Sequence, residues 1–129
     1  PEEAPLLSLV TLTSAAIAAG NTVVVVPSES HTVAASDFVR VLEASDVPAG
    51  VVNVLTGARE SLGRALAQHD GVDAVWYFGP VEGVRFIELA SAGNLKRTWV
   101  SRDAPWNLDE EEVLYRATRV KTIWIPYGA

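Results

Sequence analysis

Residues 20–29 of this 129-residue chain read GNTVVVVPSE, and this stretch decides the fold. Gly20 ends a Leu- and Ala-rich segment (residues 5–19) that we expect to be a buried helix, because it is apolar on nearly every side. Thr22 and the four valines then predict a strand covered on both faces, which Pro27 ends. A strand of this kind is typical of a parallel sheet with helices on both sides.

The rest of the chain repeats this alternation of helix and strand. Further helices are expected at about 32–45, 59–69, 81–91 and 105–118, and further strands at 51–55, 72–77, 94–101 and 120–125. Right-handed crossovers at this spacing produce a parallel sheet. The predicted fold is therefore α/β, one domain over residues 1–129. It has a three-layer, Rossmann-like sheet of about five strands, with the strands at 23–26 and 51–55 adjacent and central.

Composition excludes several classes of function. Ten Lys and Arg against sixteen Asp and Glu give a net charge of −6, which argues against a nucleic-acid partner. The absence of cysteine and the presence of only two histidines exclude disulfides, thiolate or multi-histidine metal sites and a cysteine nucleophile. No apolar run predicts a membrane span. The chain opens on Pro1 and carries no targeting signal, so we read it as a cut-out piece and expect a cytoplasmic location.

Ligands of parallel sheets bind at the carboxyl ends of the strands, which makes the loops at 27–30, 56–58 and 78–82 the candidate site. The chain contains neither G-x-G-x-x-G nor G-x-x-x-x-G-K-[ST]. Ser28 and Glu29 suit a ribose, because a carboxylate accepts hydrogen bonds from a diol, and they equally suit a helix cap with its first-turn acid. Gly57 either lets a backbone approach a ligand or simply forms a strand-to-helix turn.

Other polar residues receive structural interpretations. His31 is read as a surface histidine near a helix start, and His69 as one that faces the negative end of a helix. Lys96 and Arg97, with residues 102–103, are read as a solvated charged patch. The acidic run at 110–112 is expected to be an exposed first helical turn.

Four segments resemble the aldehyde dehydrogenase family. AAGNTVVVVPSE (residues 18–29) is similar to the family's A-A-G-N-T-V-V-x-K-P-S-E, and VPAGVVNVLTG (residues 47–57) to its L-P-x-G-V-x-N-x-V-x-G. HDGVDAVWYFGP (residues 69–80) resembles H-x-x-V-D-x-I-x-F-T-G-S, and NLKR (residues 94–97) the N-L-K-[RK] that precedes the family's E-L-G-G. The resemblance runs in order from about residue 5 to 101. It implies most of the domain that binds the coenzyme NAD in that family.

Departures from the family pattern imply that this coenzyme site is degenerate. The family's ribose-binding lysine is Val26 here, its pyrophosphate-binding serine is Pro80, and the neighbouring threonine is Phe78, a bulky ring where a cofactor would lie. Its general-base glutamate falls at Ser101, which cannot act as a carboxylate base. The family's cysteine nucleophile belongs to a catalytic domain that this chain does not contain.

The resemblance thus leaves only vestigial cofactor-binding residues, which are Ser28, Glu29, Gly57 and Gly79. We predict no catalytic residue, no metal and no bound cofactor, NAD being vestigial at best. The predicted function is a non-catalytic, pseudoenzyme domain that serves protein interaction or assembly. The alternative is an NAD-binding fragment of a working aldehyde dehydrogenase, an oxidoreductase that acts on aldehydes, with its chemistry supplied elsewhere in the full protein.

Residues 102–129 diverge from the family's coenzyme domain, and their end resembles the family's later V-W-V-N…P-F-G segment. This arrangement is similar to the C-terminal unit of tandem aldehyde dehydrogenase-like proteins. The expected partner is another protein, the rest of the full-length chain, or a second copy. Interface candidates in this divergent segment are apolar or aromatic: Trp106, Tyr115, Trp124, Ile125 and Tyr127. The alternative is that a last strand completes the sheet and these side chains cap its core.

Overall fold

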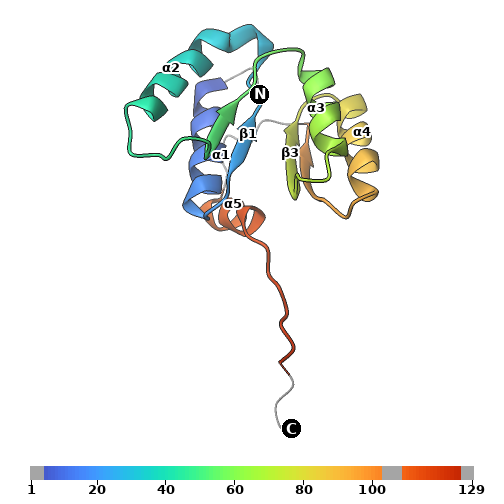
Figure 1. Cartoon of the computed structure of the whole chain (residues 1–129). Coiled ribbons are helices and arrows are strands. Elements are labelled where there is room, and N and C mark those ends of the chain that lie inside the picture. Colours follow the sequence, from blue (N-terminus) through green and yellow to red (C-terminus); the bar gives the residue numbers. More distant parts are fainter. Residues whose placement is uncertain (1–4, 103–108, 126–129) are drawn as a thin grey trace.

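The computed structural model describes residues 5–102 and 109–125, which form two halves joined by a helix (Figure 1). The first half holds α1 (Pro5–Ala18), β1 (Val23–Val25), the 3-10 turn η1 (Glu29–His31), α2 (Thr32–Glu43) and β2 (Val52–Val54). The second half holds α3 (Arg59–Gln68), β3 (Ala74–Phe78), α4 (Val81–Ala92) and β4 (Arg97–Ser101). The last helix is α5 (Glu110–Ala117), from which residues 118–125, here called the tail, run away from the body. No helix in the described ranges is long and apolar enough to cross a bilayer.

The described strands form two parallel pairs. β1 pairs with β2, with Val23 opposite Val52, and β3 pairs with β4, with Ala74 opposite Arg97. The α/β class, the parallel direction and the adjacency of the first two strands are therefore confirmed. The single sheet of about five strands is wrong for the described residues, because the four strands form two separate sheets. Neither β1 nor β2 is central, since each pair has only two strands.

The predicted strand at 120–125 is also wrong, because the tail lies in no sheet and its side chains are exposed. The reason lies in how α5 ends. Asn21, just before β1, donates through Nδ2 to the carbonyl oxygen of Ala117 at 2.8 Å. The guanidinium of Arg97, the first residue of β4, donates to the carbonyl oxygen of Thr118. These contacts hold the end of α5 at the amino ends of the strands, and the tail leaves from there away from both sheets (Figure 1).

α1 buries one face rather than its whole surface. Ser8, Leu9, Thr13 and Ala16 are buried, whereas Leu6 and Leu7 are 48% and 55% exposed. The expectation of a buried helix fails because the elements packed on α1, namely α2, β1 and α5, leave its other side uncovered. Gly20, at φ +82°, ends the helix in a backbone conformation that favours glycine, as its place after the apolar run predicts.

The core of the first half lies between α1, α2 and the β1–β2 pair. Leu9 and Phe38 are buried there with Ala35, and Val25 and Val54 pack against them. Val24, which points to the other face, is 45% exposed, so the valine strand is covered on one side only.

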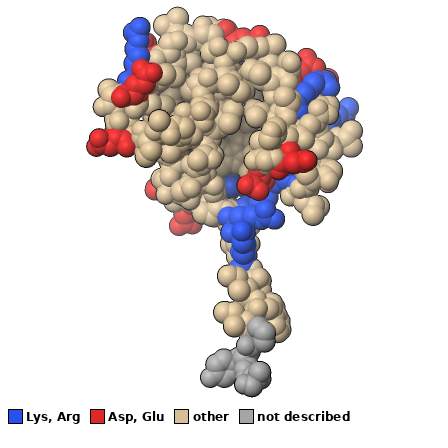
Figure 2. Space-filling view, in the orientation of Figure 1, with Lys and Arg blue, Asp and Glu red and all other residues tan. Residues whose placement is uncertain are grey.

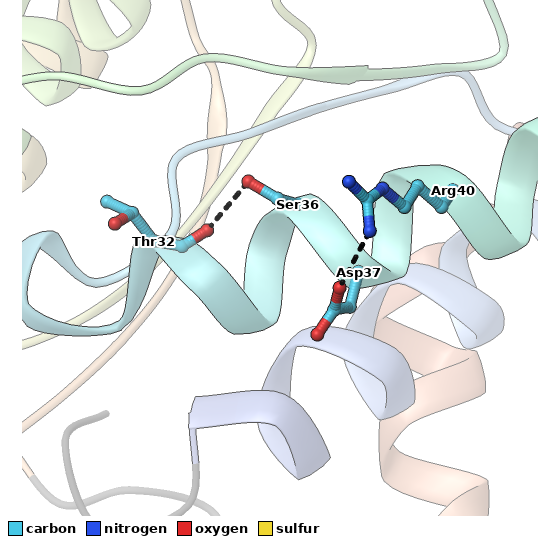
Figure 3. Close-up of polar contacts among 4 residues, drawn as sticks. All are labelled: Thr32, Ser36, Asp37 and Arg40. Carbon is cyan, nitrogen blue, oxygen red and sulfur yellow. Dashed lines mark hydrogen bonds and ion pairs between the residues drawn. The ribbon is translucent and has the colours of Figure 1, made fainter.

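α2 turns a polar face to solvent, and Figure 3 shows two of its contacts. The Ser36 hydroxyl donates to the carbonyl oxygen of Thr32 at 3.0 Å, and Arg40 lies 3.7 Å from an Asp37 carboxylate oxygen. These contacts stay within the helix, and they contribute little to stability because both ions of the pair are exposed.

Candidate functional site

A cavity of about 380 Å³ lies at the carboxyl ends of β1 and β3, where the sheet rule places a ligand. Glu29 of the first half and Pro80 of the second half both line it. The remaining walls come mostly from α3 (Arg59, Glu60, Gly63, Arg64) and α4 (Glu82, Gly83, Phe86, Ile87). Its volume is near the lower limit of small-molecule pockets, roughly 300 Å³. We call it the strand-end cavity.

Glu29 caps a helix, but not the helix that follows it. Its Oε1 accepts a hydrogen bond of 2.7 Å from the backbone N–H of Arg59, the first residue of α3. Ala58, the N-cap residue of α3, has no side-chain oxygen, so the first turn of α3 receives its acceptor from a residue thirty positions earlier. Ser28 stands at the N-cap of η1 without a side-chain capping bond. Glu29 thus has a structural role, because its hydrogen bond with the Arg59 N–H joins the two halves at the cavity.

Tyr77 closes part of the cavity at the start of α4. A Cβ built on Gly83 would overlap the Tyr77 hydroxyl, and one built on Gly79 would lie 2.9 Å from it. The phenol therefore lies against the first turn of α4, whose free N–H groups are the usual place for an anionic group. Pro80, the N-cap residue of this helix, has neither a hydroxyl nor an N–H to offer.

Charges in the strand-end cavity do not favour an anion. The lining holds three carboxylates, Glu29, Glu60 and Glu82, against the guanidiniums of Arg59 and Arg64. Arg64 is engaged on both sides, because it pairs with Glu60 at 2.9 Å and its guanidinium lies 3.9 Å from the centre of the Phe86 ring.

The other residues expected to bind a cofactor do not line this cavity. Gly57 has φ +152°, and a Cβ there would lie 3.3 Å from Leu62 Cδ1, so it serves the turn after β2. The Gly79 N–H donates to the carbonyl oxygen of Ser101 at 3.0 Å, which ties the ends of β3 and β4 together. The Ser28 hydroxyl lies 2.9 Å from that of Ser30, and Ser28 is not among the residues that line the cavity. Of the four expected residues, only Glu29 lines it.

Phe78 is not among the residues that line the strand-end cavity. Its ring packs edge-on against Trp99 at 5.2 Å, and Trp76 packs on the same indole at 5.1 Å. Adjacent residues of a strand face opposite sides, so Tyr77, and not Phe78, reaches the cavity. The sequence interpretation missed Tyr77, although Gly83 inside a predicted helix was a signal that a side chain is packed closely there.

Lys96 is buried rather than solvated. Its exposed fraction is 8%, and its ammonium donates to the carbonyl oxygens of His69 at 2.5 Å and Val72 at 2.8 Å. The Nδ1 atom of His69 accepts from the N–H of Gly71 at 3.0 Å, so both side chains hold the turn between α3 and β3. The reading of Lys96 as part of a solvated patch is wrong, whereas the acidic run at 110–112 is indeed exposed.

Three of the five interface candidates lie within the described residues. Tyr115, Trp124 and Ile125 are 61%, 91% and 77% exposed. Trp124 and Ile125 therefore do not cap a sheet core, which was the alternative interpretation. Trp106 and Tyr127 lie outside the described residues.

Comparison with known proteins agrees with the resemblance seen in the motifs. Residues 1–102 match the model of the aldehyde dehydrogenase family. The chain is 34% identical over 101 residues to the NADP/NAD-dependent aldehyde dehydrogenase PuuC of Escherichia coli, covering 78% of this chain and 20% of that protein. It is 33% identical over 103 residues to a 1-pyrroline-5-carboxylate dehydrogenase of Bacillus cereus, covering 79% of this chain and 20% of that protein.

The fold is similar to that of an aldehyde dehydrogenase from Bartonella henselae, with a TM-score of 0.67 and 29% identity. The match covers 70% of this chain and 19% of that structure. The chain thus spans about a fifth of the length of the relatives it matches.

Proposed function

Because the chain belongs to the aldehyde dehydrogenase family, we propose that it is a non-catalytic unit of that fold and that it serves protein assembly. In finer terms, we propose that it corresponds to the C-terminal unit of a tandem member of the family, with a degenerate coenzyme site and a cytoplasmic location. The observation that carries the proposal is the contact of Tyr77 with Gly83 beside Pro80. It covers the helix end at which the resemblance puts the pyrophosphate of NAD.

Further sequence features support the absence of chemistry in this unit. It contains no cysteine, and Ser101 stands where the resemblance puts the general base. Val26, in place of the ribose-binding lysine, is not among the residues that line the strand-end cavity. The loss of a charged donor typically forfeits about 1.5 to 3 kcal/mol of binding.

The exposed surface supports assembly. The chain exposes 8815 Å², whereas a compact monomer of this size exposes roughly 6,600 Å². Apolar side chains of the tail are among the exposed ones, with Val120, Ile123 and Trp124 at 83%, 78% and 91% exposure. Exposed apolar surface on this scale is typical of proteins that bind a partner.

Isothermal titration calorimetry with NAD and NADP tests the proposal. We expect a dissociation constant above roughly 1 mM for both. The double variant Val26→Lys/Pro80→Ser should gain nothing while Tyr77 covers the first turn of α4. Adding Tyr77→Val to it should produce measurable binding, whereas adding Phe78→Val should not, because Phe78 packs against Trp99. Micromolar binding of NAD by the unmodified chain would overturn the proposal.

The second candidate function is an NAD-binding fragment whose chemistry is supplied elsewhere in the full protein. The strand-end cavity favours it, since about 380 Å³ remains open beside Glu29 and Pro80. Saturation-transfer NMR separates the two candidates. Transfer from this protein to the adenine protons of NAD would favour the fragment, and no transfer would favour the assembly unit.

A further inference from the structure

The two halves share little packing in the part of the chain that the structure describes. β1 pairs with β2 and β3 pairs with β4, and no described strand joins the two sheets. The extensive packing lies within each half, with α1 on α2 and β1 in the first, and α4 on α3, β3 and β4 in the second. Figure 2 shows the body hollowed between the halves. Each half therefore has the packing of a separate unit.

The chain crosses from the first half to the second through the linker 55–58, at the carboxyl ends of the strands. Gly57 in this linker has φ +152°, a backbone conformation that favours glycine. Hinges in proteins are usually a few loop residues that absorb a change in backbone angles. Beside the linker, the Glu29 carboxylate accepts from the Arg59 N–H at 2.7 Å, which fixes the two halves to each other at this end.

At the amino ends of the strands, α5 is fixed to the first half. It packs along α1, its residue Val113 is buried, and its last residue, Ala117, accepts a hydrogen bond of 2.8 Å from Asn21. Within the described ranges, α5 packs extensively on no strand or helix of the second half. If the halves move relative to each other, α5 therefore moves with the first half.

Two arginines make the contact between α5 and the second half. Arg97, the first residue of β4, donates to the carbonyl oxygen of Thr118, and its guanidinium lies 5.6 Å from the centre of the Tyr115 ring. In the opposite direction, the guanidinium of Arg116 lies 5.6 Å from the centre of the Trp99 ring. Both distances are near the limit of about 6 Å for attraction between a cation and a ring face. We call these contacts of Arg97 and Arg116 the arginine clasp.

Arg116 is the weaker member of the arginine clasp. Its Nη2 atom lies 3.2 Å from a Glu112 carboxylate oxygen of its own helix, and its Nε atom is buried without a hydrogen-bond partner among the described residues. A buried donor without an acceptor destabilises the state that buries it. Release of the clasp returns this nitrogen to water, which favours opening.

We propose that the protein opens and closes about the linker 55–58, and that the arginine clasp holds it closed. The structure described above is the closed form. In the open form α5 stays on α1, the amino ends of β1 and β3 lie further apart, and the bond from the Arg59 N–H to Glu29 remains as the pivot. Trp99 then loses the guanidinium that covers its ring, so the clasp controls the exposure of this indole. The inference goes beyond the proposed assembly function and does not depend on it.

Distances between pairs of spin labels on the 129-residue chain test the proposal, because the chain has no cysteine of its own. The amino-end pair is Glu43→Cys with Ala92→Cys, at the last residues of α2 and α4. The carboxyl-end pair is Val33→Cys with Glu82→Cys, in the first turns of the same helices. All four positions are exposed, so the labels should not disturb the fold.

The variant Arg97→Ala/Arg116→Ala removes the arginine clasp. We expect it to raise the open population at the amino-end pair roughly five-fold, the effect of about one lost hydrogen bond. The carboxyl-end pair should keep its distance. Arg40→Ala/Arg85→Ala, which removes two exposed arginines of α2 and α4, is the matched control and should change neither pair. Arg97→Lys keeps a donor and a positive charge, so it should open the amino ends less than Arg97→Ala.

Tyr115→Ala tests the clasp even if the double variant does not fold, because Tyr115 is 61% exposed. It removes only the ring beside Arg97, and we expect it to raise the open population about two-fold. Equal amino-end distances in Tyr115→Ala and the arginine control would overturn the proposal. An equal lengthening of both label pairs would also overturn it, because the halves would then separate without a pivot.

Discussion

Gly83 is the residue against which the Tyr77 hydroxyl packs where it closes part of the strand-end cavity. Alanine usually stabilises a helix interior relative to glycine by about 1 kcal/mol, but a Cβ at Gly83 overlaps the Tyr77 hydroxyl. We expect Gly83→Ala to lower the free energy of unfolding by about 1 to 3 kcal/mol. Urea denaturation measures the change.

Gly63 is the matched control for this prediction. A Cβ there would lie 3.9 Å from Ile87 Cδ1, an ordinary contact, so Gly63→Ala in α3 should be neutral or gain up to about 1 kcal/mol. Equal stability of the Gly83→Ala and Gly63→Ala variants would contradict the position of Tyr77 described above.

Glu29 also contributes to stability as a single residue, because it caps α3 across the cavity. We expect Glu29→Ala to lower the free energy of unfolding by about 0.5 to 2 kcal/mol, since the Arg59 N–H loses its acceptor. Glu29→Gln keeps an oxygen acceptor and should lose less. Glu88→Ala, at an exposed position of α4, is the control, and thermal unfolding by circular dichroism ranks the three. The same loss in Glu29→Gln as in Glu29→Ala would point to the charge rather than the hydrogen bond.

At the scale of elements, α5 is a second tie between the two halves, besides the hydrogen bond from the Arg59 N–H to Glu29. Asn21 donates to Ala16 and Ala117 through one amide nitrogen, and Asn21→Ala removes both bonds. We expect amide hydrogens of α5 to exchange about five-fold faster, the equivalent of a hydrogen bond worth about 1 kcal/mol. Hydrogen exchange read by mass spectrometry measures this.

Asn53→Ala serves as the comparison for that exchange experiment. Asn53 donates to the carbonyl oxygen of Gly50 at 2.9 Å, within its own turn, so exchange in α5 should stay unchanged. Faster exchange of α5 in both variants would mean that Asn21 is not the tie.

The sequence predicts elements well where the signal is local. α1 ends at Ala18, just before Gly20, and the valine strand ends before Pro27. Asp109 is the N-cap residue of α5, and its carboxylate accepts from the Glu111 N–H at 3.4 Å. The prediction of a strand fails for residues 120–125, although their composition is typical of a strand. A strand also needs the free edge of a sheet to pair with. The end of α5 lies at the amino ends of β1 and β4, and residues 120–125 leave it in a direction that takes them away from both sheets.

The site was harder to predict than the elements for a related reason. Period-two alternation separates Tyr77 from Phe78, but it does not say which of the two faces the cavity. The burial of Lys96 depends on two carbonyl groups that a turn more than twenty residues away brings to it, and no local pattern encodes that contact.

At the scale of the whole molecule, we expect different residues to determine the stability of the fold and its association with a partner. The Ile123→Ser/Trp124→Ser variant changes only exposed tail positions, so its free energy of unfolding at dilutions where the chain is monomeric should stay within about 0.5 kcal/mol. Phe38→Ala, in the buried cluster of the first half, should lose about 3 to 5 kcal/mol. Differential scanning calorimetry at low concentration compares them. Unfolding of the tail variant would mean that these side chains belong to the core.

The position of α5 at the end of the described order has a consequence for synthesis on the ribosome. Translation releases both strand pairs, residues 23–54 and 74–101, before the helix that bonds to each of them through Asn21 and Arg97. Until residue 118 emerges, the nascent chain lacks the bonds from Asn21 and Arg97 to the end of α5, and the unpaired edges of its strand pairs can bind a neighbouring nascent chain. The two strand pairs are therefore tied together late in synthesis, only when α5 has left the ribosomal exit tunnel.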